Sequence, residues 1–288
     1  MTDQHTDQHA AQRTYPEGVT SWVDTEQAHV DAAAEFYGGL FGWTFTQATP
    51  SDAPFRYLVA QLGGRDVGGL GGSATPPGDG SGPDARWNTY VAVTDAEATA
   101  RRVEDAGGEI VQPPTVAGEG GRSVVLRDPH GLEVRLWEAR RRLGAQATNV
   151  PGAWNFSDLH TGPDGPAKDF YASVFGWEFD ESDYATMIRV PGYGDHLAST
   201  VDPDIHERQS GAMVPPGFAD AIGWVAPAAA EEEPGWHVTF TVADRDDAAA
   251  RAESLGATVL RRDDTAWTRT AVIRDPQGAV FTASQFLG

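Results

Sequence analysis

Residues 36–43 read Phe-Tyr-Gly-Gly-Leu-Phe-Gly-Trp, and this stretch recurs 134 residues later as Phe-Tyr-Ala-Ser-Val-Phe-Gly-Trp at residues 170–177. Five of the eight positions are identical. The same offset relates Gly18 to Gly152 and Asp24 to Asp158. Because self-similarity at a fixed offset marks a repeated structural unit, we predict that the chain contains two copies of one domain.

Two later stretches repeat in the same order. Residues 87–95, which begin Trp-Asn-Thr-Tyr-Val, correspond to residues 236–244, which begin Trp-His-Val-Thr-Phe. An Arg-Asp-Pro-x-Gly sequence occurs at residues 127–131 and again at 274–278. We therefore predict four segments: a disordered tail at 1–17, a first domain at 18–139, a linker at 140–151 and a second domain at 152–288.

The composition restricts the classes of partner. The 288 residues include 21 basic and 42 acidic side chains, which give a formal net charge of −21. Such a surface repels phosphate groups and anionic lipids, so we expect neither nucleic-acid nor membrane partners. We interpret the acidic surface as a solvated coat that favours solubility, while steering of a substrate by this field stays an open alternative.

Cysteine is absent, which excludes disulfides, thiolate metal ligands and cysteine nucleophiles. No apolar run approaches the roughly 20 residues of a membrane span. Residues 1–17 lack the apolar core of a secretory signal. Together these features predict a soluble, cytoplasmic protein.

Apolar spacing and turn residues predict the same order of elements in both domains, a strand, a helix and three strands, repeated once. The predicted helices lie at residues 28–41, 95–106, 166–175 and 246–255. The predicted strands lie at residues 18–25, 43–47, 55–62, 66–70, 87–93, 110–111, 123–126, 132–138, 153–160, 177–179, 186–190, 196–200, 236–242, 258–260, 271–273 and 279–284. Residues 71–84 and 201–235 are predicted to be connections. The expected fold class is α+β, with two β-α-β-β-β units in each domain.

Four such units, together with the Phe-Tyr…Phe-Gly-Trp helix end and the Asp-Pro-x-Gly turn, resemble the vicinal oxygen chelate superfamily. This superfamily includes glyoxalase I, bleomycin-resistance proteins, fosfomycin-resistance enzymes and extradiol dioxygenases. More narrowly, the chain is similar to actinobacterial tandem-domain proteins labelled glyoxalase-like antigens or hydroxylases. The resemblance extends from Gly18 to the C-terminus. It implies that each domain curls into a cup-shaped mixed sheet with its helices outside, and that the two domains pack about a pseudo-twofold axis within a monomer.

Metal-using members of the superfamily place their ligands on three strands. The matching positions in this sequence are Trp22 and Phe156, then Asn88 and His237, then Arg135 and Thr282. Tryptophan, phenylalanine and cationic arginine cannot donate an electron pair to a metal. The resemblance therefore implies no metal at the usual site and no cofactor, with a divalent metal restricted to a non-standard site that contains His237.

Strand alternation predicts which side chains face into each cup. Val238, Phe240 and Val242 are expected to pack against a helix. The residues expected to face inward are Trp22, Asp24, Asn88, Tyr90, Arg135, Trp137, Phe156, Asp158, His160, His237, Thr239 and Thr282. Aromatic walls with a few directed polar groups are typical of a small-molecule pocket. In the alternative interpretation the polar groups satisfy one another, Asp24 with Arg135, and Asp158 with His160 or His237.

Three hypotheses of function follow. In the first, the protein resembles bleomycin-resistance proteins and binds a small organic molecule in an aromatic and polar cup without metal. In the second, it is a lyase or isomerase of glyoxalase type, or an oxygenase of the hydroxylase-labelled kind. Its site would then be a non-standard one formed by His160, His237 and Asp158. In the third, it is an interaction protein whose cups are filled. The sequence assigns no catalytic residue.

Overall fold

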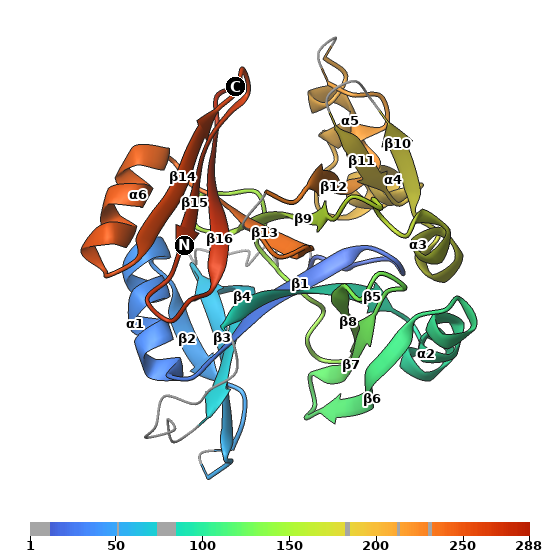
Figure 1. The fold of residues 1–288 in the computed structure, drawn as a ribbon, viewed down its shortest axis with the longest axis horizontal. Helices are drawn as coiled ribbons and strands as arrows, with labels where there is room; N and C mark the ends of the chain where they lie inside the picture. Colours follow the sequence, from blue (N-terminus) through green and yellow to red (C-terminus); the bar gives the residue numbers. More distant parts are fainter. Residues whose placement is uncertain (1–11, 51, 74–84, 182–184, 212–213, 230–231) are drawn as a thin grey trace, which may run out of the picture.

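The computed structural model describes residues 12–50, 52–73, 85–181, 185–211, 214–229 and 232–288. They form two eight-stranded mixed sheets with helices on their outer faces (Figure 1). The first sheet has the strand order β2-β3-β4-β1-β5-β8-β7-β6, and the second has the order β10-β11-β12-β9-β13-β16-β15-β14. The second order is the first one repeated eight strands later. This result confirms the predicted α+β fold of two tandem units.

The bounds of the elements follow the repeat. The first half contains β1 (Thr20–Gln27), α1 (Val30–Phe41), β2 (Thr44–Gln47), β3 (Phe55–Leu62), β4 (Arg65–Ser73), β5 (Arg86–Val93), α2 (Ala96–Asp105), β6 (Glu109–Ala117), β7 (Gly121–Arg127) and β8 (Glu133–Ala139). The second half contains β9 (Trp154–Thr161), α3 (Lys168–Phe175), β10 (Glu178–Glu181), β11 (Thr186–Arg189), α4 (Tyr193–Thr200), α5 (Ile205–Arg208), the 3-10 helix η1 (Phe218–Asp220), β12 (Ala221–Pro227), β13 (Gly235–Thr241), α6 (Arg245–Ser254), β14 (Thr258–Asp264), β15 (Thr268–Arg274) and β16 (Val280–Phe286).

The repeated Phe-Gly-Trp sequence ends a helix and contacts the opposite domain. Gly42 adopts φ 74°, and its N–H donates to the carbonyl of Gly38, which closes α1 with the left-handed residue that glycine tolerates best. Trp43 follows and donates from Nε1 to the carbonyl of Gly152 at 2.7 Å. Trp177, at the end of α3, makes the matching bond to the carbonyl of Gly18, also at 2.7 Å.

The repeated tyrosine and aspartate meet across the domains in the same reciprocal way. The Tyr37 hydroxyl donates to Asp275 Oδ2 at 2.8 Å, and the Tyr171 hydroxyl donates to Asp128 Oδ2 at 2.9 Å. The second carboxylate oxygen of each aspartate accepts two backbone N–H groups of its own Asp-Pro-x-Gly turn. The turn of one domain is therefore anchored on the helix of the other.

The outer helices also pair across the domains, α1 beside α6 and α2 beside α3 (Figure 1). Phe41 of α1 packs on Phe240 of β13, with ring centroids 5.0 Å apart. One continuous apolar core thus joins the first half of one domain to the second half of the other. These reciprocal contacts give the arrangement expected for a pseudo-twofold pair of domains.

The first unit of the second domain departs from the prediction. Residues 196–200 were predicted to form a strand, but they lie in helix α4, so that prediction is wrong. Tyr193 and Leu197 stand one helical turn apart and both are buried, a pattern of helical rather than strand packing. The predicted connection at 201–235 in fact contains β12, which pairs in parallel with β9. The predicted connection at 71–84 begins too early, because residues 71–73 belong to β4, and its remainder lies outside the described residues.

Two segments expected to lie outside the domains make specific contacts. Arg13, expected to belong to the disordered tail, donates from its backbone N–H to Gln146 Oε1 at 3.0 Å and from Nη2 to the Tyr193 hydroxyl at 3.0 Å. The linker residues Ala145 and Ala147 are buried, and Ala145 N–H donates to the carbonyl of Ser21. The linker therefore runs along the first domain as part of its core.

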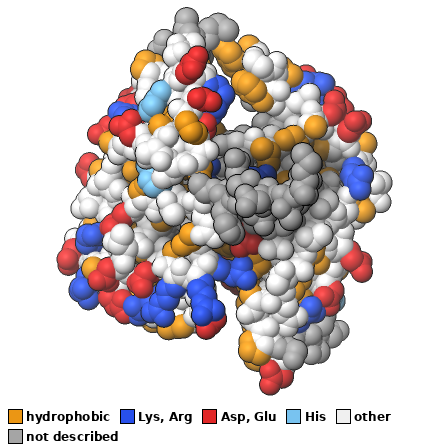
Figure 2. Space-filling model, turned by 180° about the vertical axis from the view of Figure 1, so that it is seen from behind, with side chains coloured by type: hydrophobic (Ala, Val, Ile, Leu, Met, Phe, Trp, Pro, Cys, Tyr) orange, Lys and Arg blue, Asp and Glu red, His pale blue; other side chains and the backbone are white. Residues whose placement is uncertain are grey.

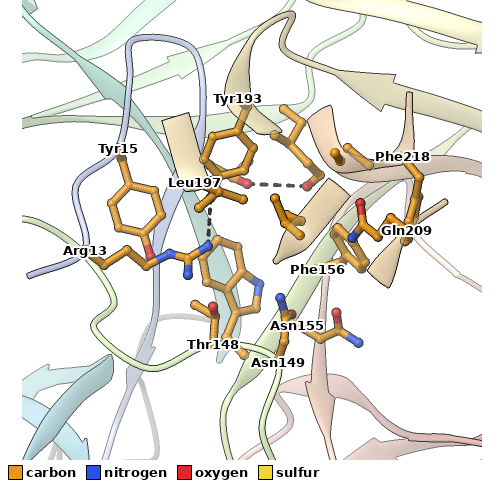
Figure 3. Close-up of a pocket in the computed structure, with 16 residues that line it drawn as sticks. Arg13, Tyr15, Thr148, Asn149, Asn155, Phe156, Tyr193, Leu197, Gln209 and Phe218 are labelled. Carbon is orange, nitrogen blue, oxygen red and sulfur yellow. Dashed lines mark hydrogen bonds between the residues drawn. The ribbon is translucent and has the colours of Figure 1, made fainter. Parts of the chain in front are cut away.

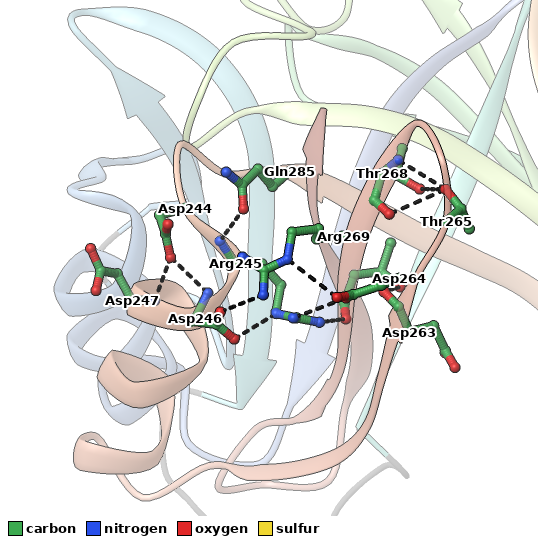
Figure 4. A network of polar contacts seen from close by, with 11 residues as sticks. Asp244, Arg245, Asp246, Asp247, Asp263, Asp264, Thr265, Thr268, Arg269 and Gln285 are labelled. Carbon is green, nitrogen blue, oxygen red and sulfur yellow. Dashed lines mark hydrogen bonds and ion pairs between the residues drawn. The ribbon is translucent and has the colours of Figure 1, made fainter. Parts of the chain in front are cut away.

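A buried arginine fixes the start of α6 to the hairpin of β14 and β15 (Figure 4). Arg245 is 4% exposed and donates from Nη1 to the carbonyl of Thr270 at 2.7 Å. Asp246 accepts bonds from both Arg245 and Arg269 at 2.8 Å. A buried cation needs such partners, since an unpaired one would carry a large desolvation penalty. We assign this network a structural role.

Acidic and basic side chains are interspersed over the face seen from behind in Figure 2. This distribution agrees with a solvated surface of mixed charge, not with one large patch of a single charge. Among the described residues, no helix is both long enough and apolar enough to cross a membrane.

Candidate functional site

Asp24 of β1 is the centre of the first cup. Its side chain is 2% exposed and accepts hydrogen bonds from the Tyr90 hydroxyl at 2.7 Å, Asn88 Nδ2 at 2.9 Å and the Tyr57 hydroxyl at 3.0 Å. The β1–β5 register places Asn88 directly opposite Asp24. Burial raises the pKa of Asp24, against the opposing effects of Arg135 and of these donors.

Arg135 of β8 supplies the positive charge of this cup. Its Nη1 lies 2.8 Å from Glu26 Oε1, 3.1 Å from the Tyr90 hydroxyl and 3.7 Å from Asp24 Oδ1. Burial alone would lower the pKa of Arg135, but Tyr90, Asp24 and Glu26 raise it above its ordinary value. Asp24 and Arg135 therefore form an ion pair, as the alternative interpretation predicted, while Arg135 Nε is buried without a hydrogen-bond partner among the described residues.

Two tryptophans close the first cup. Trp22 Nε1 donates to the Tyr57 hydroxyl at 2.9 Å, and Trp137 Nε1 donates to the carbonyl of the linker residue Arg142 at 2.8 Å. The Trp137 ring also meets the Tyr90 ring edge to face. These contacts hold the rings of Trp22 and Trp137 against other groups of the protein.

The second cup is arranged differently. Asp158 of β9 accepts from the backbone N–H of Trp224 at 3.1 Å, and burial raises its pKa to about 6 against the opposing effects of His160 and this bond. The alternative interpretation paired Asp158 with His160 or His237, but Asp158 forms its hydrogen bond with β12 and both histidines lie nearest to Glu232. His160 acts on Asp158 through its charge. Thr239 is buried and lies opposite Phe156 in the β9–β13 register.

His160, Glu232 and His237 converge in the second cup. His160 Nδ1 lies 2.6 Å from Glu232 Oε1, and His237 Nδ1 lies 3.5 Å from the same oxygen. The imidazole rings are parallel within 4°, with centroids 4.8 Å apart. His237 Nε2 lies 2.9 Å from Thr282 Oγ1. One potential ligand atom from each of the three residues lies within 4.8 Å of the others.

The charges of this group are set by its surroundings. Burial lowers the pKa of His237 to about 4, and the nearby His160 acts in the same direction. Burial alone would raise the pKa of Glu232, but the Ala229 N–H and the two imidazoles lower it. At neutral pH the group therefore combines a neutral His237 with an ionised carboxylate.

A small cavity of about 70 Å³ lies beside Phe156 (Figure 3). Arg13 from the N-terminal segment, Tyr193 of α4 and Gln209 surround it. Arg13 Nε, Trp154 Nε1 and Gln209 Oε1 are buried without a hydrogen-bond partner among the described residues. Its size suits one or two water molecules rather than an organic ligand.

A larger cavity of about 890 Å³ lies between the two domains. Its walls come from the starts of β5 and β8 in the first sheet, from β13 to β16 in the second, and from the segment before β13. Its charged lining residues are Arg86, Arg127, Arg135, Arg261, Arg274, Glu133, Glu232 and Glu233. His237, Asn88 and Arg135 are the predicted inward residues that reach this cavity.

Glu232 and Tyr57 are the site residues that the sequence analysis missed. Glu232 belongs to a run of three glutamates before β13, in a stretch predicted to be a connection. The register of β9 and β13 could have located Glu232. His160 lies opposite Gly235, so residues just before Gly235 lie near His160. Tyr57 sits on β3, where strand alternation alone does not reveal the partner of its hydroxyl.

Comparison with known proteins assigns both halves of the chain to a family. A family model described as the Glyoxalase/Bleomycin resistance protein/Dioxygenase superfamily matches residues 27–136. A second model, described as a Glyoxalase-like domain, matches residues 160–284. The chain belongs to the glyoxalase/bleomycin resistance protein/dioxygenase superfamily, as its motifs predicted.

Particular relatives cover nearly the whole chain. The protein named "Putative glyoxylase CFP32" of Mycobacterium tuberculosis is 32% identical over 274 residues, which are 93% of this chain and 95% of the relative. The anthracycline biosynthesis protein DnrV of Streptomyces peucetius is 31% identical over 275 residues, 92% of each chain.

Solved structures show the same fold at low identity. The Mn(II)-bound glyoxalase from Novosphingobium aromaticivorans has a TM-score of 0.56 and 16% identity, covering 94% of this chain and 83% of its own. The 2,3-dioxygenase LapB from Pseudomonas sp. KL28 has a TM-score of 0.58 and 11% identity, and the match covers 95% of this chain and 93% of LapB.

The residues at the three usual metal positions offer few groups that could hold a cation. In the first cup, Arg135 is itself a buried cation and Trp22 is a hydrogen-bond donor to Tyr57. In the second cup, Phe156 has no donor atom, and Thr282 lies beside His237 Nε2. Neither set fits a divalent metal at the usual positions.

Proposed function

We propose that the protein binds a small organic molecule with an acidic group in the 890 Å³ cavity between its domains. The observation that carries this proposal is the lining of the cavity, which has five arginines and three glutamates. Four of these arginines pair with a carboxylate, and Arg274 has no ion-pair partner among the described residues. The chain as a whole has twice as many acidic as basic residues. Arginine forms strong, directed hydrogen bonds to carboxylates.

Size and access support the proposal. A volume of about 890 Å³ lies within the range of roughly 300–1,000 Å³ that is typical of ligand sites. Arg274 is exposed and has no ion-pair partner among the described residues, so its guanidinium is free to meet a ligand. The relationship to an anthracycline biosynthesis protein supports aromatic molecules as the first ligands to test.

The test compares 2-naphthoate with 2-naphthamide, which differ in the acidic group, by isothermal titration calorimetry. We expect the carboxylate to bind more tightly, and Arg274→Gln to weaken its binding by about tenfold, which is the loss of roughly 1.4 kcal/mol from one charge-assisted hydrogen bond. Arg101→Gln is the matched control, since Arg101 is an exposed arginine of α2 outside the cavity. Equal affinity for the two ligands, or equal loss in both variants, would contradict the proposal.

An enzyme of lyase, isomerase or oxygenase type is the second candidate. The convergence of His160, Glu232 and His237 beside the cavity favours it. Recovery of a bound ligand chemically unchanged after prolonged incubation supports simple binding, whereas conversion of the ligand supports an enzyme. The filled-cup hypothesis is supported for the first cup alone, where the protein's own linker lies over Trp137.

A further inference from the structure

We propose that His160, Glu232 and His237 form a binding site for a divalent transition metal, at a position displaced from the one that the superfamily uses. Of these three residues, only His237 occupies a usual metal position. The proposal goes beyond ligand binding in the cavity and does not depend on it.

The spacing of the donor atoms is close to that around an ion, although the stacked rings of His160 and His237 must turn so that both in-plane lone pairs point to it. A tetrahedral metal with Zn–N and Zn–O distances of about 2.0–2.2 Å holds its ligand atoms roughly 3.3 Å apart. His237 Nδ1 and Glu232 Oε1 are already 3.5 Å apart, and His160 Nδ1 lies 2.6 Å from that oxygen. Glu232 would therefore withdraw from His160 by less than about 1 Å. Two imidazoles and one carboxylate suit zinc, cobalt or nickel better than magnesium or calcium.

The surrounding structure orients both imidazoles. β9 and β13 pair in antiparallel register, with His160 opposite Gly235 and His237 opposite Asp158. The side chains of His160 and His237 thus stand on one face of two adjacent strands. Their rings are stacked with centroids 4.8 Å apart, so one ring must rotate before both can bind the same ion. When Nε2 of His237 donates to Thr282 Oγ1, the lone pair of Nδ1 points toward the Glu232 carboxylate. Two electron-rich atoms that face each other in this way are the arrangement that a cation stabilises.

The equivalent positions of the first cup hold an arginine. By the repeat, His160 corresponds to Glu26, His237 to Asn88, and Thr282 to Arg135. The guanidinium of Arg135 lies between Glu26 and Asp24 and supplies a positive charge. Threonine replaces that arginine in the second cup, where Glu232 contributes a carboxylate instead. In the second cup the metal ion supplies the charge that Arg135 supplies in the first.

The site is open on one side. Glu232 and His237 both line the 890 Å³ cavity. Their side chains are 26% and 11% exposed, and that of His160 is 15% exposed. Three protein ligands leave at least one coordination position free for water or for a ligand in the cavity, the arrangement of metal sites that take part in binding or chemistry.

The test uses protein without a histidine tag, freed of metal by a chelator and dialysed. Isothermal titration calorimetry with Zn²⁺ and with Co²⁺, beside elemental analysis, measures affinity and stoichiometry. We expect one ion per chain. His160→Gln, Glu232→Gln and His237→Gln should each abolish the one-to-one binding, and Thr282→Val should weaken it by about 10- to 100-fold, the usual effect of removing an outer-shell partner.

His206→Gln is the matched control, because His206 also faces a carboxylate, Asp195, but lies on the exposed helix α5. It should bind metal as the unchanged protein does. Circular dichroism and urea unfolding of each metal-free variant check that the fold is kept. Three outcomes would overturn the proposal: no binding by the unchanged protein at millimolar metal, full binding by folded His160→Gln and His237→Gln, or equal loss in the control.

Discussion

At the scale of single residues, the two cups use homologous aspartates in different ways. Asp24 accepts three side-chain hydrogen bonds and lies near a guanidinium, whereas Asp158 accepts one backbone N–H. Removing one partner of a buried charged network leaves the other charge uncompensated. The first aspartate should therefore matter more for stability than the second.

Asp24→Ala should lower the free energy of unfolding by about 3 kcal/mol or more, because Arg135 stays buried with less negative charge around it. Asp158→Ala is the matched substitution and should lower it by about 1–2 kcal/mol. Urea unfolding followed by fluorescence measures both. Equal effects, or a larger effect of Asp158→Ala, would show that the first network contributes less than its geometry indicates.

His237 gives a prediction for pH. Its pKa is lowered to about 4 in the folded protein, chiefly by burial, against an unfolded value of 6.5. Between these two values the unfolded chain binds a proton that the folded chain does not, so stability should fall as the pH falls from 6.5 toward 4. Urea unfolding of metal-free protein across this range measures the fall.

The matched variant is His237→Gln, which cannot take up this proton. Its stability should decline less than that of the unchanged protein over the same pH range. Histidine ring resonances followed by NMR give the pKa of His237 directly. A value near 6.5 would contradict the prediction.

At the scale of elements, the helix end of one domain is fixed to the turn of the other. Tyr37→Phe removes the hydroxyl that donates to Asp275 at 2.8 Å and accepts from Trp87 Nε1 at 3.1 Å. Among the described residues, Gln27 is then the donor left to that carboxylate oxygen. We expect a loss of about 1–3 kcal/mol in unfolding free energy, since the site is buried. Tyr171→Phe is the equivalent change in the second domain and should cost a similar amount.

The double variant tests whether the two contacts are independent. Because they lie in separate clusters, their costs should add within about 0.5 kcal/mol. Urea unfolding of the two single variants and the double variant supplies the comparison. A marked departure from additivity would show that the Tyr37–Asp275 and Tyr171–Asp128 contacts are energetically coupled.

Much of the element pattern could be predicted from the sequence because it depends on local physics. Period-two alternation placed Val238 and Phe240 in the core, and both are fully buried. Gly42 and Gly176 mark helix ends because their positive φ values suit glycine. Residues 196–200 could not be assigned in this way, since the burial of Tyr193 and Leu197 that favours a helix depends on distant segments.

The candidate site was predictable only in part, for a similar reason. Alternation and the repeat brought His160 and His237 to one face, and their rings do stack. Glu232 precedes β13 outside any periodic element, so its position follows from strand register and not from local sequence. The partner of Asp158 was likewise unpredictable, because the backbone of β12 supplies it.

At the scale of the whole molecule, the cavity depends on both halves of the chain. Arg86, Arg127 and Arg135 come from the first sheet, and Arg261 and Arg274 come from the second. The comparison of 2-naphthoate with 2-naphthamide therefore examines a property of the assembled pair of domains. The metal titration examines the second cup alone, so the two experiments can fail separately.

The difference between Arg135 and Thr282 has a consequence for how such a chain can change over time. In a pair of identical subunits every substitution appears twice, so an arginine that fills one cup would fill both. In a chain that carries both copies in tandem, each copy can vary by itself. One half can then specialise in holding the molecule together, while the other keeps room for chemistry.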